Sequence, residues 1–271
     1  MFVKELNYEF CIKFCIMNYN LCSLSIGYPT KVVAHDINAM LTAGELVCLI
    51  GRNGTGKSTL LRTMAGFLPP LAGKATIDDC DISAIAPAVR ARKIGVVLTD
   101  RIDAMNMSVT DLVAMGRSPY TGFFGRLGEE DRTIVNDALA MVGMENFAQR
   151  MVETLSDGER QKVMIAKALA QQTPVILLDE PTAFLDYPSK TETLRLLRRL
   201  CHEQGKAILV STHDLDVALR ITDKVWMMQH GDDASSAAGQ SRLLTGTTDE
   251  LKAQIDDFMT TFRWVLKIPT S

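Results

Sequence analysis

A glycine-rich run that ends in a lysine and a serine limits the folds open to this chain more than any other feature. The run GRNGTGKS occupies residues 51–58, directly after an apolar segment, ELVCLI, at residues 45–50. The residues that follow, STLLRTMAGF, have the composition of a helix. Glycines allow a tight turn in which successive backbone N–H groups converge on a phosphate at a helix N-terminus. Because this strand–loop–helix context is what the pattern requires, the sequence predicts a phosphate-binding loop.

The residues of the loop divide between phosphate binding and metal binding. We expect the Lys57 ammonium to reach the β- and γ-phosphates of a nucleotide and the Ser58 hydroxyl to hold Mg²⁺. The cofactors implied are therefore ATP and Mg²⁺. The other residues of the loop expected to contact the nucleotide are Gly51, Arg52, Asn53, Gly54, Thr55, Gly56 and Thr59. By itself the loop leaves kinases, GTPases, motors and transporters open.

Composition favours a protein of the reducing cytosol and gives no sign of nucleic-acid binding. The 271 residues carry a net charge of −3, which is not the basic balance that nucleic-acid binding favours. The 6 cysteines form no C-x-x-C pair, which fits a reducing compartment. No run approaches the roughly 18 consecutive apolar residues needed to cross a bilayer. We therefore expect the chain by itself to be soluble.

The first 20 residues are expected to form an extension ahead of the domain. Charged residues interrupt its apolar positions and no small-residue cleavage site follows, so the pattern is not that of a signal peptide. Met17 stands just before the first clear strand. We expect that translation starts at Met17 or that the extension is dispensable.

The spacing of apolar runs predicts an α/β fold with a mostly parallel core sheet. Five near-continuous apolar runs have the length of strands buried on both faces, and helical stretches lie between most of them. These runs are ELVCLI, KIGVVL, PVILLD, KAILVST and DKVWMMQ. Residues 22–29 and 31–41 precede all five runs and look like an antiparallel edge.

The alternation of strands and helices is interrupted at about residues 101–172. Three helical patterns lie there without a strong strand between them, which predicts a helical subdomain inserted into the core. After the core, a strand is expected at residues 241–246 and a helix at 247–255. The expected domain therefore covers residues 21–255, between the extension 1–20 and a tail at 256–271.

Two adjacent carboxylates end the stretch PVILLDE at residues 174–180. We expect Asp179, at the tip of this strand, to reach the Mg²⁺ shell opposite the loop. Glu180 would orient and deprotonate an attacking water, as a general base does. The alternative is a strand that ends in acids because it meets solvent.

Together with the loop and LLDEPTAFLD at residues 177–186, the segment LSDGERQ at 155–161 resembles the signature of ATP-binding cassette (ABC) ATPases. The resemblance covers nearly all of residues 21–255 in the family's order and implies a P-loop NTPase fold of the ABC type. In that family the signature caps the γ-phosphate bound by the other subunit, so two chains form a head-to-tail dimer around two ATPs. The residues carried over are Ser156, Asp157, Gly158 and Glu159; Asp157 replaces the family's usual second glycine and Glu159 its usual glutamine.

Three further residues match family positions. Tyr28 matches an aromatic residue that stacks on adenine, although a surface tyrosine in a turn is the alternative. His213, in VSTHDL, matches the switch histidine that contacts the γ-phosphate. Asp186 matches a loop that communicates across the dimer.

One family position differs from the usual residue. The family places a glutamine that senses Mg²⁺ at the end of the strand before the helical subdomain, and the aligned stretch here is IGVVLTDR. The position is Thr99, whose hydroxyl is shorter than a glutamine amide. Asp100 offers the hard carboxylate oxygen that Mg²⁺ prefers. The sequence leaves both residues open as metal-sensing groups.

The segment SVTDLVAMGRSPYTGFFGRLGEED, residues 108–131, resembles the ATPases of importers for ferric siderophores, haem and cobalamin. The resemblance implies the ATPase subunit of a bacterial importer, bound peripherally at the cytoplasmic face of the inner (cell) membrane. Its partners would be a second cassette, two integral-membrane permease subunits and, indirectly, a periplasmic or lipoprotein substrate-binding protein. The alternative is a soluble ABC ATPase of an iron–sulfur cluster assembly scaffold.

Overall fold

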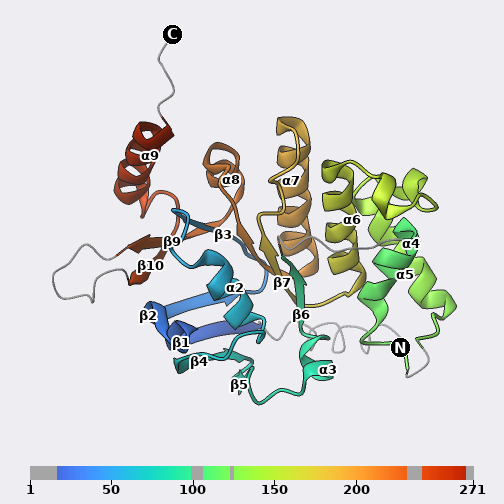
Figure 1. Cartoon of the computed structure of the whole chain (residues 1–271), viewed down its shortest axis with the longest axis horizontal. Helices are drawn as coiled ribbons and strands as arrows, with labels where there is room; N and C mark the ends of the chain where they lie inside the picture. The colour runs from blue at the N-terminus through green and yellow to red at the C-terminus, as the bar shows by residue number, and fades with distance from the viewer. Residues whose placement is uncertain (1–16, 99–105, 123–124, 231–239, 267–271) are drawn as a thin grey trace, which may run out of the picture.

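The computed structural model describes residues 17–98, 106–122, 125–230 and 240–266, and within them ten strands form one sheet. The strand order is β5-β4-β1-β2-β10-β9-β3-β8-β7-β6. Figure 1 shows this sheet at the centre and left of the molecule, with a group of helices at the right.

One half of the sheet is parallel. It consists of β9 (Lys224–His230), β3 (Leu46–Gly51), β8 (Ala207–Ser211), β7 (Val175–Asp179) and β6 (Ile94–Val97). Each neighbouring pair in this half runs parallel, and every residue of β3, β7 and β8 is buried. Strands covered on both faces need continuous apolar runs, so the predicted parallel core is confirmed.

The other half of the sheet is antiparallel and larger than expected. The predicted pair forms as β1 (Asn18–Tyr28) and β2 (Lys31–Thr42). Beyond β1 lie β4 (Ala72–Ile77) and β5 (Cys80–Asp81), which the sequence did not predict. β10 (Ser241–Gly246) joins the two halves because it pairs antiparallel with β9 and bridges to β2.

Helices cover both faces of the parallel half and enclose two hydrophobic cores. Alternate residues of β3 enter different cores: Cys48 and Ile50 join one, whereas Val47 and Leu49 join the other. α2 (Lys57–Met64) packs into the second core, and α7 (Tyr187–Gln204) and α8 (Leu215–Ile221) pack into the first. The sheet therefore lies between two helical layers, as the fold class requires.

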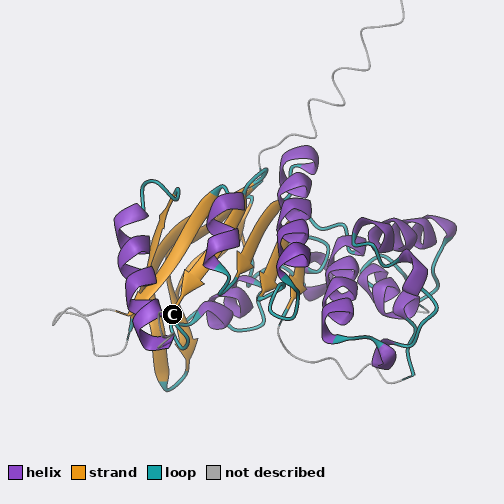
Figure 2. Ribbon diagram, turned by 90° about the horizontal axis from the view of Figure 1, so that it is seen from above, coloured by secondary structure: helices purple, strands orange, loops and turns teal. Residues whose placement is uncertain are grey.

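A group of helices lies beside the β6 end of the sheet, as Figures 1 and 2 both show. It comprises α4 (Val109–Ala114), α5 (Glu129–Met141), α6 (Asp157–Ala170) and the short turns η1 (Met115–Arg117), η2 (Glu145–Phe147) and η3 (Val152–Thr154). α6 packs on both α4 and α5. The inserted helical subdomain is confirmed as part of the fold, and we refer to this group as the helical subdomain.

The first strand and the last helix differ in position from the expectation. β1 begins at Asn18, inside the segment expected to precede the domain. The final helix, α9 (Lys252–Leu266), starts later than the expected helix and continues past residue 255. Its buried Ile255, with Phe258 and Met259, packs against the core, so the expected boundary at 255 falls within a packed helix.

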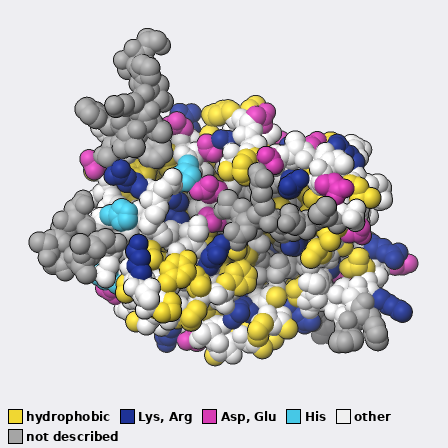
Figure 3. All heavy atoms as spheres, viewed as in Figure 1, with side chains coloured by type: hydrophobic (Ala, Val, Ile, Leu, Met, Phe, Trp, Pro, Cys, Tyr) yellow, Lys and Arg dark blue, Asp and Glu magenta, His cyan; other side chains and the backbone are white. Residues whose placement is uncertain are grey.

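Part of the surface is apolar. The short helix α3 (Pro87–Arg90) follows the antiparallel strands, and Figure 3 shows hydrophobic side chains gathered over the region of α2 and α3. Phe67 and Leu71, which follow α2, and Val89, in α3, are exposed. Within the described parts of the chain, no helix is long and apolar enough to cross a membrane.

A buried arginine connects the elements of the helical subdomain. The guanidinium of Arg117 donates hydrogen bonds to the carboxylate of Asp131 at 2.8 Å, the carbonyl of Ala170 at 3.0 Å and the amide oxygen of Gln172 at 3.1 Å. The ring of Tyr120 lies 4.1 Å from the guanidinium carbon, a cation–π distance. The hydrogen bond from Arg117 is the largest of the influences that lower the pKa of Asp131. Arg117 therefore holds α5 and the end of α6 to the turn after α4.

We predict that Arg117→Met destabilises the protein by about 2–4 kcal/mol, because it leaves Asp131 without its charged partner. Urea unfolding followed by circular dichroism measures this change. Arg132→Met, which removes an exposed arginine of α5, is the matched control and should change stability by less than about 0.5 kcal/mol. Equal stability of the two variants would show that Arg117 has no special structural role.

Candidate nucleotide-binding site

The predicted site residues gather at one edge of the sheet. β3, β8 and β7 are parallel neighbours, with β8 in the middle. Their carboxyl ends therefore lie side by side. The loop leaves β3, His213 follows β8, and Asp179 ends β7 with Glu180 directly after it. Crevices at the carboxyl ends of parallel strands are the usual ligand sites of such sheets.

Two glycines of the loop stand where no side chain fits. A Cβ on Gly56 would lie 2.3 Å from Val33 Cγ1, and the φ of Gly56 is +103°. A Cβ on Gly51 would lie 2.7 Å from the carbonyl oxygen of Met228. The loop thus passes close to β2 and β9, and only glycine permits this approach.

Lys57 folds back over the loop. Its ammonium donates hydrogen bonds to the carbonyls of Gly51 at 2.8 Å and Arg52 at 3.3 Å. Burial lowers the pKa of Lys57, while the negative charges of Glu180 and Asp179 act in the opposite direction. The lysine and the two carboxylates are therefore electrostatic neighbours, although they are far apart in the sequence.

The other loop residues differ in exposure. Thr55 is fully buried, and its hydroxyl donates to the carbonyl of Arg52 at 2.8 Å. Thr59 is also buried, in the first turn of α2, next to Ser58, whose side chain is exposed. Asn53 and Gly54 are exposed at the tip of the loop.

A buried serine, which the sequence did not single out, holds the Asp179 carboxylate and the backbone of Glu180. Ser211, at the end of β8, donates a hydrogen bond to Asp179 Oδ1 at 2.6 Å and accepts one from the backbone N–H of Glu180 at 3.0 Å. Asp179 is only 4% exposed. Its place at the end of a predicted strand is the one clue in the sequence, because Ser211 is the register partner of Asp179 on the neighbouring strand.

Glu180 contacts His213 and has an unusual backbone conformation. His213 Nε2 lies 2.5 Å from Glu180 Oε1, so the two predicted catalytic residues form a pair. The φ of Glu180 is +52°, in the left-handed region where a residue with a Cβ is strained. Its backbone N–H also donates to the Ser211 carbonyl at 3.2 Å. Ser211 therefore fixes the backbone of Glu180 while His213 fixes its side chain.

The signature residues form a helix cap. The Ser156 hydroxyl accepts from the N–H of Glu159 at 3.3 Å, and the Glu159 carboxylate accepts from the N–H of Ser156 at 2.8 Å. Hydrogen bonds from Ser156 lower the pKa of Glu159. This capping box accepts glutamate or glutamine in its third helical position, which explains how Glu159 can stand where the family has glutamine.

The remaining signature residues lie at the same helix end. Asp157 is exposed in the first turn of α6. A Cβ on Gly158 would lie 3.2 Å from the carbonyl of Phe184, so the signature contacts the segment between β7 and α7. In Figure 1, α6 lies on the far side of β7 from α2, which separates the signature from the loop of the same chain.

The other predicted residues occupy more peripheral positions. Tyr28 is 45% exposed and ends β1, opposite Lys31 in the hairpin. Asp186 caps α7 by accepting from the N–H of Ser189 at 3.1 Å, and this bonding lowers its pKa. Thr99 and Asp100 lie outside the described residues.

The fold and the loop define a P-loop ATPase. A family model described as "ABC transporter" matches residues 34–183. The chain is 40% identical over 208 residues to the iron(3+)-hydroxamate import ATP-binding protein FhuC of Bacillus subtilis, which is 77% of either chain. It is 38% identical over 240 residues to the cobalamin import ATP-binding protein BtuD of Halobacterium salinarum, covering 89% of this chain but 59% of that relative's length.

Solved structures agree with the sequence relatives. The ATP-binding cassette MJ0796, in a dimeric post-hydrolysis state bound to ADP and Pi, matches with a TM-score of 0.69 at 29% identity. The match covers 77% of this chain and 93% of that one. This chain belongs to the ABC transporter family, and it is an ATPase that binds ATP.

We predict that Ser211→Ala lowers the ATPase rate by about tenfold and raises the Mg²⁺ concentration needed for half-maximal rate, because Asp179 loses a short hydrogen bond. A Mg²⁺ titration of steady-state ATPase measures both changes. Ser241→Ala is the matched control, since Ser241 is a buried serine of the same sheet that contacts His230 instead. If the two variants behave alike, the orienting role of Ser211 is wrong.

Proposed function

We propose that this chain is the ATPase subunit of an importer that takes up an iron–siderophore, haem or cobalamin-type compound. The observation that carries the proposal is the similarity, over most of the chain, to proteins named for iron(3+)-hydroxamate and cobalamin import. The ferric enterobactin transport ATP-binding protein FepC of Escherichia coli, 36% identical over 208 residues, supports the same cargo class. The iron–sulfur scaffold alternative has no comparable relative among these.

Membrane partners follow from the same proposal. The chain would bind two permease subunits at the cytoplasmic face of the cell membrane, and a substrate-binding protein would deliver the cargo to them. The exposed apolar side chains of Phe67, Leu71 and Val89 support a protein contact on that surface, because apolar groups gathered on a surface favour partner binding.

The chain's own residues suit nucleotide and metal binding. The loop amides and Lys57 would bind the phosphates, and Tyr28 would stack on adenine. Ser58 and Asp179 fit Mg²⁺ because both offer hard oxygen ligands, and the hydrogen bond from Ser211 holds one Asp179 oxygen in place at 2.6 Å. When bound, Mg²⁺ neutralises charge on the phosphate oxygens.

Glu180 and His213 would carry the proton chemistry. The Glu180 carboxylate would accept a proton from water as that water attacks the γ-phosphate. The contact between His213 Nε2 and Glu180 Oε1 would hold the carboxylate in one orientation, and His213 would also lie within reach of the γ-phosphate. The strained backbone of Glu180 supports this assignment, since strain of this kind concentrates at functional sites.

A second copy of the chain would complete each site. Ser156 and Gly158, at the N-terminus of α6, would cap the γ-phosphate bound by the partner chain, and the helix dipole favours an anion there. Asp186 would connect the two sites across the dimer. The dimeric state of the related cassette MJ0796 supports this arrangement.

Reconstituted transport tests the function. The chain is expressed with the permease genes that neighbour its own gene, and the complex is placed in lipid vesicles with ATP. Uptake of labelled ferric hydroxamate, haem and cobalamin is then measured with the matching binding protein. ATP-dependent uptake of one of the three is expected. Uptake of none of them, with ATPase intact, contradicts the cargo class.

We predict that Glu180→Gln retains ATP binding but lowers hydrolysis by about 10²-fold or more, because the base is lost. With ATP trapped, light scattering should give a mass near twice 29.9 kDa. Glu130→Gln, in the exposed first turn of α5, is the control and should hydrolyse normally. Normal hydrolysis by the Glu180→Gln chain would show that Glu180 is not the general base. A monomeric mass with ATP bound would show that the isolated chain does not form the head-to-tail dimer.

A further inference from the structure

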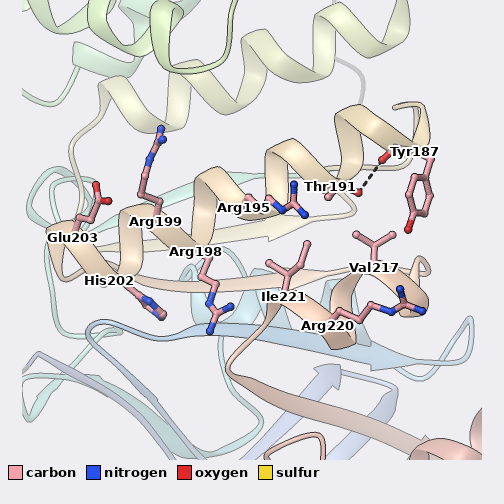
Figure 4. A pocket seen from close by; sticks show the side chains of 10 residues that line it. All are labelled: Tyr187, Thr191, Arg195, Arg198, Arg199, His202, Glu203, Val217, Arg220 and Ile221. Carbon is pink, nitrogen blue, oxygen red and sulfur yellow. Dashed lines mark hydrogen bonds between the residues drawn. The ribbon is translucent and has the colours of Figure 1, made fainter.

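A groove of about 600 Å³ lies between α7 and α8, away from the phosphate-binding loop. Figure 4 shows its side chains, with Tyr187 near one end and His202 near the other. Arginines line it from both helices: Arg195, Arg198 and Arg199 from α7, and Arg220 from α8.

The groove is built by the spacing of residues along two helices. Tyr187, Thr191, Arg195, Arg198 and His202 follow one another at intervals of three or four residues along α7. Residues at this spacing share one face of a helix. On α8, Val217 and Ile221 supply apolar contacts on either side of Arg220 in the lining.

Most of the positive charge in the groove has no carboxylate partner. Arg198 pairs with Asp223 at 3.2 Å, and His202 contacts the same carboxylate at 3.1 Å. Arg195, Arg199 and Arg220 form no ion pair with any carboxylate of the described residues. Glu203 is the one acidic residue in the described lining.

This charge is local, because the chain as a whole carries −3. An ordinary solvated helix face would spread its arginines over a convex surface. Here Arg198 and Arg220 come from facing helices, and in Figure 4 they extend toward opposite ends of the groove, with Arg195 along α7 between them and Arg199 turned away from α8. Like charges spaced along one concave surface repel one another, and an anion that lies among them relieves this repulsion.

We propose that this groove binds a phosphate-bearing anion of about nucleotide size, at a second site distinct from the loop. Guanidinium groups match phosphate oxygens in geometry and charge. Several cations spaced along a groove favour a ligand with several negative charges, and the Tyr187 ring offers a flat apolar surface at one end. The volume lies within the range of roughly 300–1,000 Å³ that small-molecule sites occupy.

The ligand would act on the elements that hold the proposed catalytic residues. α7 begins at its cap Asp186, and α8 begins just after His213. Lys190 of α7 and Asp214 join the two helix starts by an ion pair of 2.7 Å. An anion with several charges that contacts Arg198 toward one end of the groove and Arg220 toward the other would add a second link between the helices.

The test measures tripolyphosphate binding by calorimetry at low salt. The Lys57→Ala chain is used so that the loop contributes little. In that background, Arg195→Gln with Arg220→Gln should weaken binding by about tenfold or more, because two charged contacts are lost. Arg132→Gln, on α5, is the matched control and should leave affinity unchanged. ADP and AMP are titrated in parallel, so that their affinities relative to tripolyphosphate separate a nucleotide from an inorganic phosphate chain.

Three results would overturn the proposal: no tripolyphosphate binding by the Lys57→Ala chain, equal affinity in the double variant, or an equal loss in the Arg132→Gln control. Unfolding temperatures of the variants check that each is folded. Sedimentation with vesicles of phosphatidylcholine and phosphatidylglycerol is the last arm. Vesicle binding that depends on Arg195 and Arg220, without tripolyphosphate binding, would assign the groove to a membrane surface instead.

Discussion

Burial of the parallel strands on both faces is the constraint on which the rest of the structure depends. Strands β3, β7 and β8 have no exposed residue, so polar chemistry can enter only where they end. The loop, the carboxylates and the histidine all stand at those ends. Ser211 also stands at such an end, where it is buried as the register partner of Asp179. Its hydroxyl can remain there since both of its hydrogen bonds are made to groups of the site.

The core and the chemical groups could be predicted from the sequence, whereas the contacts that hold them could not. Continuous apolar runs and a local motif report strands and a loop directly. β4 and β5 were not predicted because β4 is half exposed and β5 has two residues, so neither has a clear apolar pattern. Ser211 escaped because its partners lie more than 30 residues away, and only the strand order brings them together.

The segment that marks the importer subgroup has a structural explanation. Within it, Arg117 contacts Tyr120, Asp131 and the end of α6. The sequence pattern therefore reports how the helical subdomain is packed. The signature also has a structural explanation, because Glu159 replaces the usual glutamine and still completes the capping box with Ser156. Hydrogen bonds explain the presence of Arg117 in the helical subdomain, and they allow Glu159 in the signature.

The close approach of Gly56 to Val33 has a consequence for the whole nucleotide. It presses the loop against β2, the strand whose hairpin carries Tyr28 at its turn. The loop and Tyr28 therefore both adjoin the β1–β2 hairpin. If the adenine ring is held at Tyr28 and the phosphates at the loop, the separation of these two sites determines which ligands are long enough to reach both. A molecule with the right phosphates but the wrong distance to its ring would engage only one end.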